Sequence, residues 1–290
     1  MRVSLLHSEN AGGSVSLDQL ESLITGHGHV LTHVVDDRSD VHTLLQDHVE
    51  VVVACGGDGT VAAAARYLAG RGVPLAILPL GTANNIAKSL GVDRSLDELI
   101  SSWDFARRRP FDLGVVRAGS GDCTFVESVG LGLVAEVIAA LPSHPGPEDE
   151  SPEQQVQRAL QVYLDVLERF EARPCGLRVD GQAVDGDFLL VEIMNISTVG
   201  PNLVFAPDAD PSDGVLSVVR AGEAQRETLM RHLRRRIQGH DERLELPTML
   251  ARHVELIGDE TMHVDDQMKE WPVSGGVSAR IVCGALDVLG

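Results

Sequence analysis

Aromatic residues are scarce in this sequence, since Phe, Trp and Tyr make up only 3% of the 290 residues. Stacked aromatic side chains are therefore excluded as the main content of the core, which has to be built from Val, Leu, Ile and Ala. The apolar fraction of 43% is nevertheless that of a folded globular protein, and the length suggests two domains.

Cysteines are few as well. The four thiols, at Cys55, Cys123, Cys175 and Cys283, stand at no metal-ligand or redox spacing. We predict free thiols in a reducing compartment, which favours a cytoplasmic location.

Long apolar runs and positive charge are also missing. No basic start is followed by an apolar stretch, so neither a signal peptide nor a membrane span is predicted. Lys and Arg number 24 against 43 Asp and Glu, which gives a net charge of −19. Such a chain is repelled by nucleic acid and by anionic membrane surfaces. Nucleic-acid binding is therefore excluded, and membrane contact is expected to be transient.

The first third of the sequence alternates strand and helix patterns. Strands are predicted over residues 3–6, 30–35, 51–55 and 75–78, and helices over 17–25, 61–69 and 83–90. The continuous apolar run 51–55 is typical of a strand that is buried on both faces. This order predicts a doubly wound parallel sheet with helices on both faces.

After Pro110 the pattern changes to short strands separated by turn residues. They are predicted at 112–117, 124–129, 176–179, 188–194, 215–219, 254–257, 262–264 and 279–282, with helices at 152–170 and 224–237. This pattern predicts an antiparallel sandwich or barrel. We predict an α/β domain over residues 1–110 and a β-rich domain over 111–290, with the extreme C-terminus free to return to the first domain.

The first candidate site is Gly56-Gly57-Asp58-Gly59-Thr60, between a buried strand and an Ala-rich helix. Glycines let a backbone approach phosphates closely, and the N–H groups at a helix start attract anions. Asp58 is a candidate Mg²⁺ ligand, directly or through water. The alternative is a tight turn in which Asp58 or Thr60 is the N-cap.

A second turn, the segment LPLGTANN over residues 78–85, has the same context. Thr82 is either its helix N-cap or part of a binding site. Asn84 and Asn85 are poor helix formers, so their amides are candidates to bind phosphate or a Mg²⁺-bound water. Parallel strands open ligand sites at their carboxyl edge, and both turns are expected to meet there.

GGDGT, followed about twenty residues later by PLGTANN, resembles the catalytic domain of diacylglycerol and sphingosine kinases and their bacterial soluble relatives. NAD kinases and phosphofructokinases share the first motif, whereas the second favours the lipid kinases. The resemblance implies an NAD kinase-like α/β domain and a β-rich domain, with ATP in the cleft between them. It further implies ATP- and Mg²⁺-dependent transfer of phosphate to a lipid hydroxyl, and it is compatible with a homodimer.

Further segments resemble the family more loosely. Phe111-Asp112-Leu113-Gly114 is similar to the first strand of its second domain, and the segment ESVGLG over 127–132 to a glycine-containing turn. Asp213-Gly214 resembles a segment where some bacterial members place a structural metal. Asp213 is therefore a candidate metal ligand, with an ordinary Asp-Gly turn as the alternative.

The sequence departs from the family at two places. Ser8 and Glu9 stand where an Asn-Pro pair is usual, which leaves the adenine and ribose contacts open. Near the C-terminus, Gln267 stands where the family has a Glu that resembles a general base, and an amide cannot accept that proton. Asp265 matches the Asp of the motif and is expected to contact the acceptor hydroxyl. Glu270 is a less suitable substitute base.

Two remaining patterns are interpreted more simply. The segment GLGLVA over 130–135 fits a dinucleotide fingerprint, but no acidic residue follows at a strand end, and we interpret it as a turn. A basic cluster lies on the predicted helix 224–237. It is interpreted as a solvated face rather than a site for phosphate or anionic lipid, and consists of Arg226, Arg231, Arg234, Arg235 and Arg236.

Three functions remain open from the sequence. The first is a kinase acting on diacylglycerol or a related lipid. The second is a kinase of the same fold acting on a soluble alcohol or on NAD, and the third is a nucleotide-binding regulator without catalysis, as the Gln267 departure allows. The predicted site residues are Asp58 and Asp265 for catalysis, Asp58 and Asp213 for metal, and Gly56, Gly57, Gly59, Thr60, Gly81, Thr82, Asn84 and Asn85 for ATP.

Overall fold

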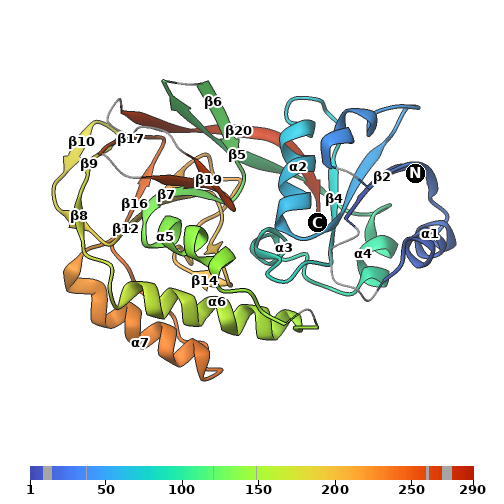
Figure 1. Cartoon of the computed structure of the whole chain (residues 1–290). Helices are drawn as coiled ribbons and strands as arrows, with labels where there is room; N and C mark the ends of the chain where they lie inside the picture. The colour runs from blue at the N-terminus through green and yellow to red at the C-terminus, as the bar shows by residue number, and fades with distance from the viewer. Residues whose placement is uncertain (9–14, 37, 120, 148, 259–260, 270–275) are drawn as a thin grey trace. The chain divides into compact units, whose positions relative to one another are not determined.

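The computed structural model describes residues 1–8, 15–36, 38–119, 121–147, 149–258, 261–269 and 276–290 (Figure 1). By its internal contacts the chain divides into two compact units. The first unit consists of Met1–Asp112 and Cys283–Gly290, and the second of Leu113–Val282. The final residues therefore belong to the first unit, although they follow the second unit in the sequence.

The first unit is built on parallel strands in the order β2-β1-β3-β4-β20. Their bounds are Arg2–His7 for β1, Val30–Val35 for β2, Val51–Gly56 for β3, Leu75–Pro79 for β4 and Val277–Leu289 for β20. Every residue of β3 is buried. This agrees with the continuous apolar pattern of that segment and with a strand covered on both faces.

Helices cover both faces of this sheet, as the predicted doubly wound fold requires. They are α1 (Leu17–Gly26), the short 3₁₀ helix η1 (Arg38–Thr43), α2 (Asp58–Leu68), α3 (Asn85–Leu90) and α4 (Leu96–Ser102). The first of these packs beside α4, whereas α2 packs beside η1 (Figure 1). The fold class predicted for this part of the chain is confirmed.

The end of β20 completes the first unit. Val288 pairs with Leu75 of β4 in parallel register. The Gly70 N–H donates a hydrogen bond of 2.7 Å to the carbonyl oxygen of Ala285. The Gly284 N–H donates one of 2.6 Å to the carboxylate of Asp112. These contacts fix the last strand against residues that lie far earlier in the sequence.

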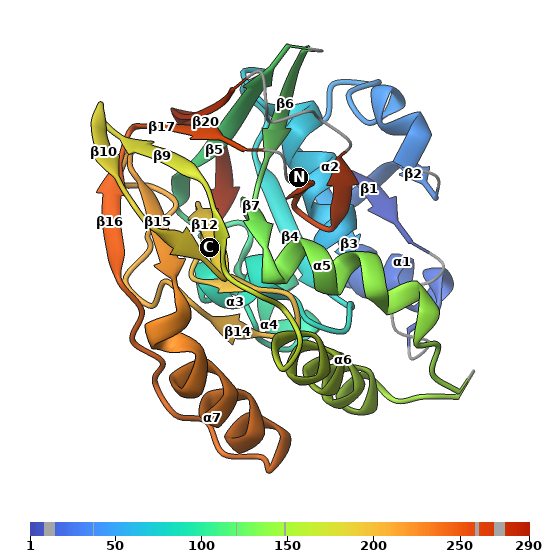
Figure 2. The ribbon, with the colours of Figure 1, turned by 60° about the vertical axis from the view of Figure 1, so that its left-hand side comes forward.

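The second unit is β-rich, and the strand pairs within its described residues are all antiparallel (Figure 2). One sheet has the order β16-β15-β12-β7-β18-β19. Its strands are β7 (Ser128–Gly132), β12 (Leu190–Met194), β15 (Leu216–Ala221), β16 (Thr248–Ala251), β18 (Met262–Val264) and β19 (Gln267–Lys269). The other strands are β5 (Arg108–Ala118), β6 (Gly121–Phe125), β9 (Gly176–Val179), β10 (Gln182–Val184), β17 (His253–Ile257) and the first part of β20.

Two separate apolar cores hold this unit together, and β12 contributes to both. Val191 and Ile193 point into a core that also includes residues of β5, β9, β17 and β18. Leu190 and Met194 point the opposite way, into a core shared with three helices. The side chain of Glu192 lies on that second, helix-covered face, because alternate residues of a strand share one face.

The three helices of the second unit are α5 (Leu133–Ala140), α6 (Pro152–Leu167) and α7 (Arg226–Ile237), with the short 3₁₀ helices η2 (Leu141–Ser143) and η3 (Glu223–Gln225). β8 (Arg173–Pro174) pairs with β11 (Asp187–Phe188), and β13 (Thr198–Val199) pairs with β14 (Leu203–Val204), both in antiparallel register. The interpretation of residues 130–135 as a turn is wrong, since β7 runs directly into α5 there. The glycine at position 132, with φ of +84°, makes this junction.

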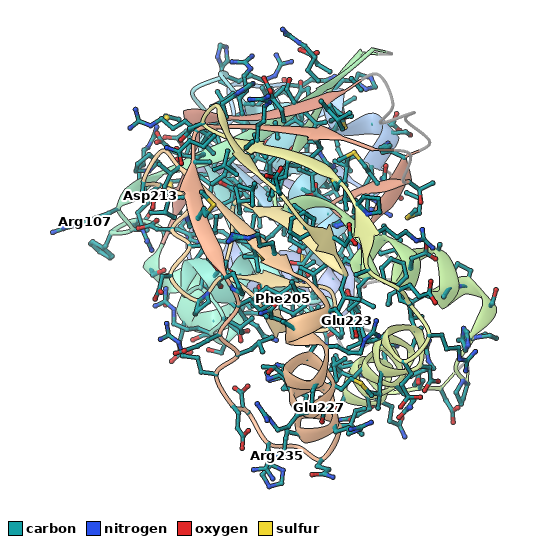
Figure 3. All side chains as sticks on the ribbon, turned by 90° about the vertical axis from the view of Figure 1, so that its left-hand side faces the viewer. Arg107, Phe205, Asp213, Glu223, Glu227 and Arg235 are labelled. Atoms are coloured by element: carbon teal, nitrogen blue, oxygen red, sulfur yellow. The ribbon has the colours of Figure 1, made fainter. Side chains whose placement is uncertain are left out.

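The basic cluster on α7 is largely neutralised by acidic partners. Arg234 lies 3.6 Å from Glu168, and Arg236 lies 2.6 Å from Asp241. Arg235, which projects outward in Figure 3, pairs with a glutamate in the following loop. Arg231 and Arg234 are exposed, as a solvated face predicts, whereas Arg226, Arg235 and Arg236 are partly buried. Among the residues that the structure describes, no helix is both long and apolar enough to cross a membrane.

Candidate functional site

The two glycine turns, residues 56–60 and 78–85, are in direct contact. A Cβ atom placed on Gly81 would lie 2.2 Å from the Cα of Gly57, and one placed on Gly57 would lie 3.1 Å from the Cα of Gly81. The Leu80 N–H also donates a hydrogen bond of 3.0 Å to the carbonyl oxygen of Gly56. The turns meet at the carboxyl edge of β3 and β4, as expected, and only glycine permits this approach.

The helices that follow the two turns begin without a side-chain cap. Gly57 is the N-cap of α2, and Asn84 is the N-cap of α3 with a left-handed φ of 53°. The alternatives in which Thr82 caps the second helix, or Asp58 or Thr60 caps the first, are therefore wrong. A helix start without a side-chain cap leaves N–H groups directed at whatever lies in front of it.

Several other helices begin with a side-chain cap. Ser16, Ser95 and Ser151 begin α1, α4 and α6, and each forms a complete capping box with the residue three positions later. The starts of α5 and α7 also have no side-chain cap, so a missing cap does not by itself indicate a ligand. What sets α2 and α3 apart is that their uncapped starts follow two glycine turns in direct contact, an arrangement that suits an anionic ligand.

Asp58 connects the two turns. Its carboxylate accepts a hydrogen bond of 2.9 Å from the Ile86 N–H in the first turn of α3. Asp58 is partly exposed, at the first position of α2. A carboxylate held there by one backbone N–H can also face a cation in front of the turns. Its catalytic and metal-binding roles stay predictions.

Asn84 shapes the second turn rather than facing outward. Its side-chain oxygen accepts a hydrogen bond of 2.9 Å from the Gly81 N–H, and its Nδ2 donates one of 2.8 Å to the Gly81 carbonyl. Thr60 and Asn85 are each only 3% exposed. Thr82 is exposed and Gly59 is partly exposed. The structure thus gathers all the predicted ATP-binding residues at one place, where their role in binding stays a prediction.

Asp265 lies in the second unit, in the turn between β18 and β19, with a φ of 51°. It is 6% exposed. Its Oδ1 accepts hydrogen bonds from the N–H groups of Val126 at 3.1 Å, Glu127 at 2.8 Å and Ser128 at 3.3 Å. The carboxylate therefore organises the turn before β7, and its contact with an acceptor hydroxyl stays a prediction.

A buried charged pair beside Asp265 was not predicted from the sequence. His263 and Glu192 are both 0% exposed, and Nε2 of the ring lies 3.0 Å from each carboxylate oxygen. The only sequence signal is a Glu inside the apolar strand LVEIM and a His between Met and Val. Neither signal identifies its partner, because the two residues are 71 positions apart.

Asp213 has the geometry of an ordinary turn. It is exposed, as Figure 3 shows, and its carboxylate accepts a hydrogen bond of 3.0 Å from the Val215 N–H. Within the described part of the chain, no group of three or more His, Cys, Asp or Glu side chains is arranged to hold a metal ion. Glu9, which stands in place of the usual Asn-Pro pair, and Glu270, the less suitable substitute base, lie outside the described residues.

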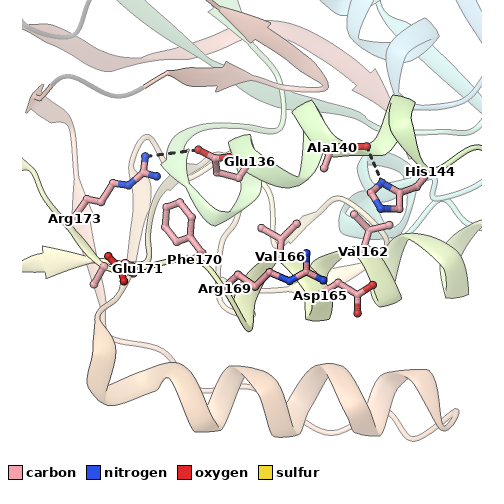
Figure 4. Close-up of a pocket in the computed structure, with 11 residues that line it drawn as sticks. Glu136, Ala140, His144, Val162, Asp165, Val166, Arg169, Phe170, Glu171 and Arg173 are labelled. Carbon is pink, nitrogen blue, oxygen red and sulfur yellow. Dashed lines mark hydrogen bonds and ion pairs between the residues drawn. The ribbon is translucent and has the colours of Figure 1, made fainter.

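A pocket of about 520 Å³ lies between α5 and α6 in the second unit (Figure 4). Val162, Val166 and Phe170 give it an apolar wall. Charged side chains line the rest, and Arg173 lies 3.7 Å from Glu136 and stacks over the Phe170 ring at 4.8 Å. A pocket with apolar and charged walls fits an amphiphilic molecule.

Comparisons with known proteins agree with this architecture. Residues 7–116 match the family model of the diacylglycerol kinase catalytic domain, and residues 151–290 match that of the YegS C-terminal NAD kinase beta sandwich-like domain. A diacylglycerol kinase of Mycobacterium tuberculosis is 28% identical over 242 residues, covering 79% of this chain and 75% of the relative. A probable lipid kinase, YegS-like, of Klebsiella pneumoniae is 31% identical over 180 residues, covering 59% of this chain and 56% of the relative.

The fold is also that of solved structures. A crystal structure of a diacylglycerol kinase from Bacillus anthracis has a TM-score of 0.71 at 17% identity, covering 99% of this chain and 96% of the other. The matches define the class of protein as a phosphotransferase that acts on an alcohol group. The chain belongs to the diacylglycerol kinase family of lipid kinases.

Proposed function

We propose that this chain transfers the γ-phosphoryl group of ATP to a hydroxyl of a lipid such as diacylglycerol, in a Mg²⁺-dependent reaction. The observation that carries the proposal is the contact between two glycine turns whose helices both begin without a side-chain cap. Such a pair of turns presents backbone N–H groups to a triphosphate. Phosphoryl transfer depends mainly on positioning and charge neutralisation, which these groups supply.

The residues at the turns fit a magnesium ion that is bound together with ATP. Mg²⁺ is usually held by one or two carboxylates, with the remaining positions taken by substrate phosphates and water. Asp58 supplies one carboxylate at the carboxyl edge of β3 and β4, where the two turns meet. When bound, the ion neutralises charge on the transferred phosphoryl group. In this proposal Gly56, Gly57 and Gly59 cradle the phosphates through their backbone.

Asp265 is proposed to orient the acceptor hydroxyl from the second unit. Three backbone N–H groups hold its carboxylate in one position. Gln267, where the family has Glu, is exposed, and its amide oxygen accepts a hydrogen bond of 3.1 Å from Lys269. Since an amide accepts no proton, we expect a slow enzyme in which orientation outweighs base catalysis. The pocket between α5 and α6 is the candidate site for the apolar part of the acceptor.

The decisive experiment incubates the purified chain with labelled ATP and Mg²⁺, with either a lipid extract or a pool of soluble metabolites as acceptor. Label in the lipid fraction supports the proposal. Label only in the soluble pool contradicts it and supports a kinase for a soluble alcohol or NAD. Replacing Gln267 by Glu is expected to raise the rate if the missing base limits it.

A regulator without catalysis is the second candidate, and the Gln267 departure favours it. It predicts that ATP raises the melting temperature while no acceptor becomes labelled. A cytoplasmic location, a homodimer and transient membrane contact remain predictions from the sequence.

A further inference from the structure

The buried pair of Glu192 and His263 spans three adjacent strands. Glu192 of β12 and His263 of β18 both stand opposite Gly130 of β7 in the strand register. A Cβ atom on Gly130 would lie 2.2 Å from Oε1 of Glu192. The glycine therefore opens the path by which the carboxylate crosses the middle strand and reaches the ring.

Both nitrogens of His263 face oxygen atoms. Nε2 lies 3.0 Å from both oxygens of Glu192, and Nδ1 lies 2.8 Å from the carbonyl oxygen of Asp265. When Glu192 is ionised both partners accept, and a neutral ring, which has one N–H, cannot donate to both; with an ionised Glu192 the ring is therefore assigned as an imidazolium. Burial alone would lower the pKa of His263. The Glu192 charge and the hydrogen bond to the Asp265 carbonyl raise this pKa by more than burial lowers it, so the net pKa is above the usual value of histidine.

The ring is joined to the turn that carries the predicted catalytic carboxylate. Its Nδ1–H donates a hydrogen bond to the backbone carbonyl of Asp265. The φ of Asp265 is 51°, which is unusual for a residue other than glycine. The side chain of the same residue holds three consecutive N–H groups before β7. A continuous set of contacts therefore leads from Glu192 through His263 to Asp265.

We propose that Glu192 and His263 are positioning residues that fix the turn at Asp265, so that its carboxylate is presented to the acceptor hydroxyl. The inference rests on the proposed function for the identity of the hydroxyl. It goes beyond that function by assigning the orientation of Asp265 to a buried ion pair. Both residues of the pair are fully buried, so neither is assigned a contact with nucleotide or acceptor.

The neighbours of the ring decide how it responds to pH. Burial, together with the Glu192 charge, raises the pKa of Tyr163 on α6, which keeps that neighbour neutral. Other ionisable groups on the elements packed around the pair are Glu127 before β7, Glu136 on α5, Asp265 itself and Lys269 on β19. Arg220 on β15 stands opposite Val191 in the register and so belongs to the other face of the sheet. His263 is the group expected to lose its proton as the pH rises above neutrality.

The sign of the pH effect follows from the raised pKa. The contribution of the pair is complete below about 6.5, the usual pKa of histidine, and is lost as the pH rises through the raised value. Deprotonation leaves the ring one N–H for two acceptors. We therefore expect kcat to fall on the alkaline side as the Asp265 turn loosens.

The test uses two single variants, Glu192→Gln and His263→Gln. We expect kcat to fall at least about tenfold, because small misplacement of a reacting group is costly, while KM for ATP changes little. In E192Q the His263 ring signal, followed by NMR, should titrate at lower pH than in the wild type, and the alkaline limb of kcat should move with it. His232→Gln is the matched control, since His232 is a buried histidine on α7 of the same unit, and it should leave the pH profile unchanged.

A measurement that does not need activity separates this inference from the proposed function. Hydrogen exchange at the amides of Val126, Glu127 and Ser128 should be about tenfold faster or more in both variants, since charge-assisted bonds are lost or loosened. If no acceptor is ever labelled, the proposed function fails while exchange and NMR still decide the role of the pair.

The inference is overturned by a His263 ring that titrates near 6.5 in the wild type, or by folded variants with wild-type exchange at these amides. If the single variants do not fold, the double variant Glu192→Leu with His263→Met removes both charges, a change that buried pairs often tolerate. It should fold and still exchange fast at the three amides. Slow exchange in that variant contradicts the inference.

Discussion

Replacing Gly81 by Ala tests the contact between the two glycine turns. The new Cβ would lie 2.2 Å from the Cα of Gly57, whereas ordinary van der Waals contact begins at 3.4 Å, so the turns have to separate by about 1.2 Å. Overpacking of this kind costs about 1–3 kcal/mol of stability. Because a displacement of about 1 Å in a positioned site can cost about 10²-fold in rate, kcat/KM should fall by that order.

Two further alanine variants make the test graded. Gly57→Ala brings its Cβ to 3.1 Å from Gly81, so the turns need to move only about 0.3 Å, and the loss of rate should be much smaller. Gly26→Ala at the end of α1 meets nothing within 4 Å and serves as the control. Rates are measured with labelled ATP and melting by calorimetry. Equal rates for all three variants would refute the reasoning that the close approach of the turns is functional.

Three other predictions concern single positions. Asp58→Ala should leave a folded protein with transfer reduced about 10²-fold or more, and unchanged transfer removes this carboxylate from the mechanism. Gly130→Ala should lower the free energy of unfolding by about 3 kcal/mol or more, because its Cβ displaces a buried carboxylate, and a wild-type midpoint in urea contradicts this. Burial raises the pKa of the Cys55 thiol to about 12. At pH 8, iodoacetamide should therefore modify the exposed thiol of Cys283 first, and should modify Cys55 only after unfolding in urea. Equal labelling of both thiols in the native protein argues against the burial of Cys55.

The parallel fold and the two turns were accessible from the sequence because both depend on local patterns. Continuous apolar runs marked β3 and β4, and each was followed by a glycine-bearing segment. Since parallel strands present their carboxyl ends at one edge, the meeting of the turns followed from topology alone. The local detail was less accessible. Thr82 is a favourable capping residue by type. The N-cap position is nevertheless taken by Asn84, which has a left-handed backbone conformation and whose side chain accepts a hydrogen bond from Gly81.

The environment of Asp265 was not accessible, because it depends on pairing between distant strands. A sequence shows that Glu192 and His263 are unusual in apolar strands, but their meeting requires the register of β12, β7 and β18. The same holds for the N–H groups of residues 126–128, which are more than 130 positions from the carboxylate that holds them. Likewise, the junction at Gly132 resembled a turn because a strand that leads straight into a helix leaves no polar loop to mark it.

The return of β20 to β4 has a consequence for how the protein is made. The pairing of Val288 with Leu75 and the bond from Gly284 to Asp112 join the last part of the chain to the first unit. During translation, the edge of β4 that later pairs with β20 stays unpaired while the whole second unit emerges from the ribosome. Because an unpaired strand edge can pair with another chain, β4 is the strand at which the nascent chain stays prone to aggregation longest. The first unit can be finished only after the second unit has been synthesised.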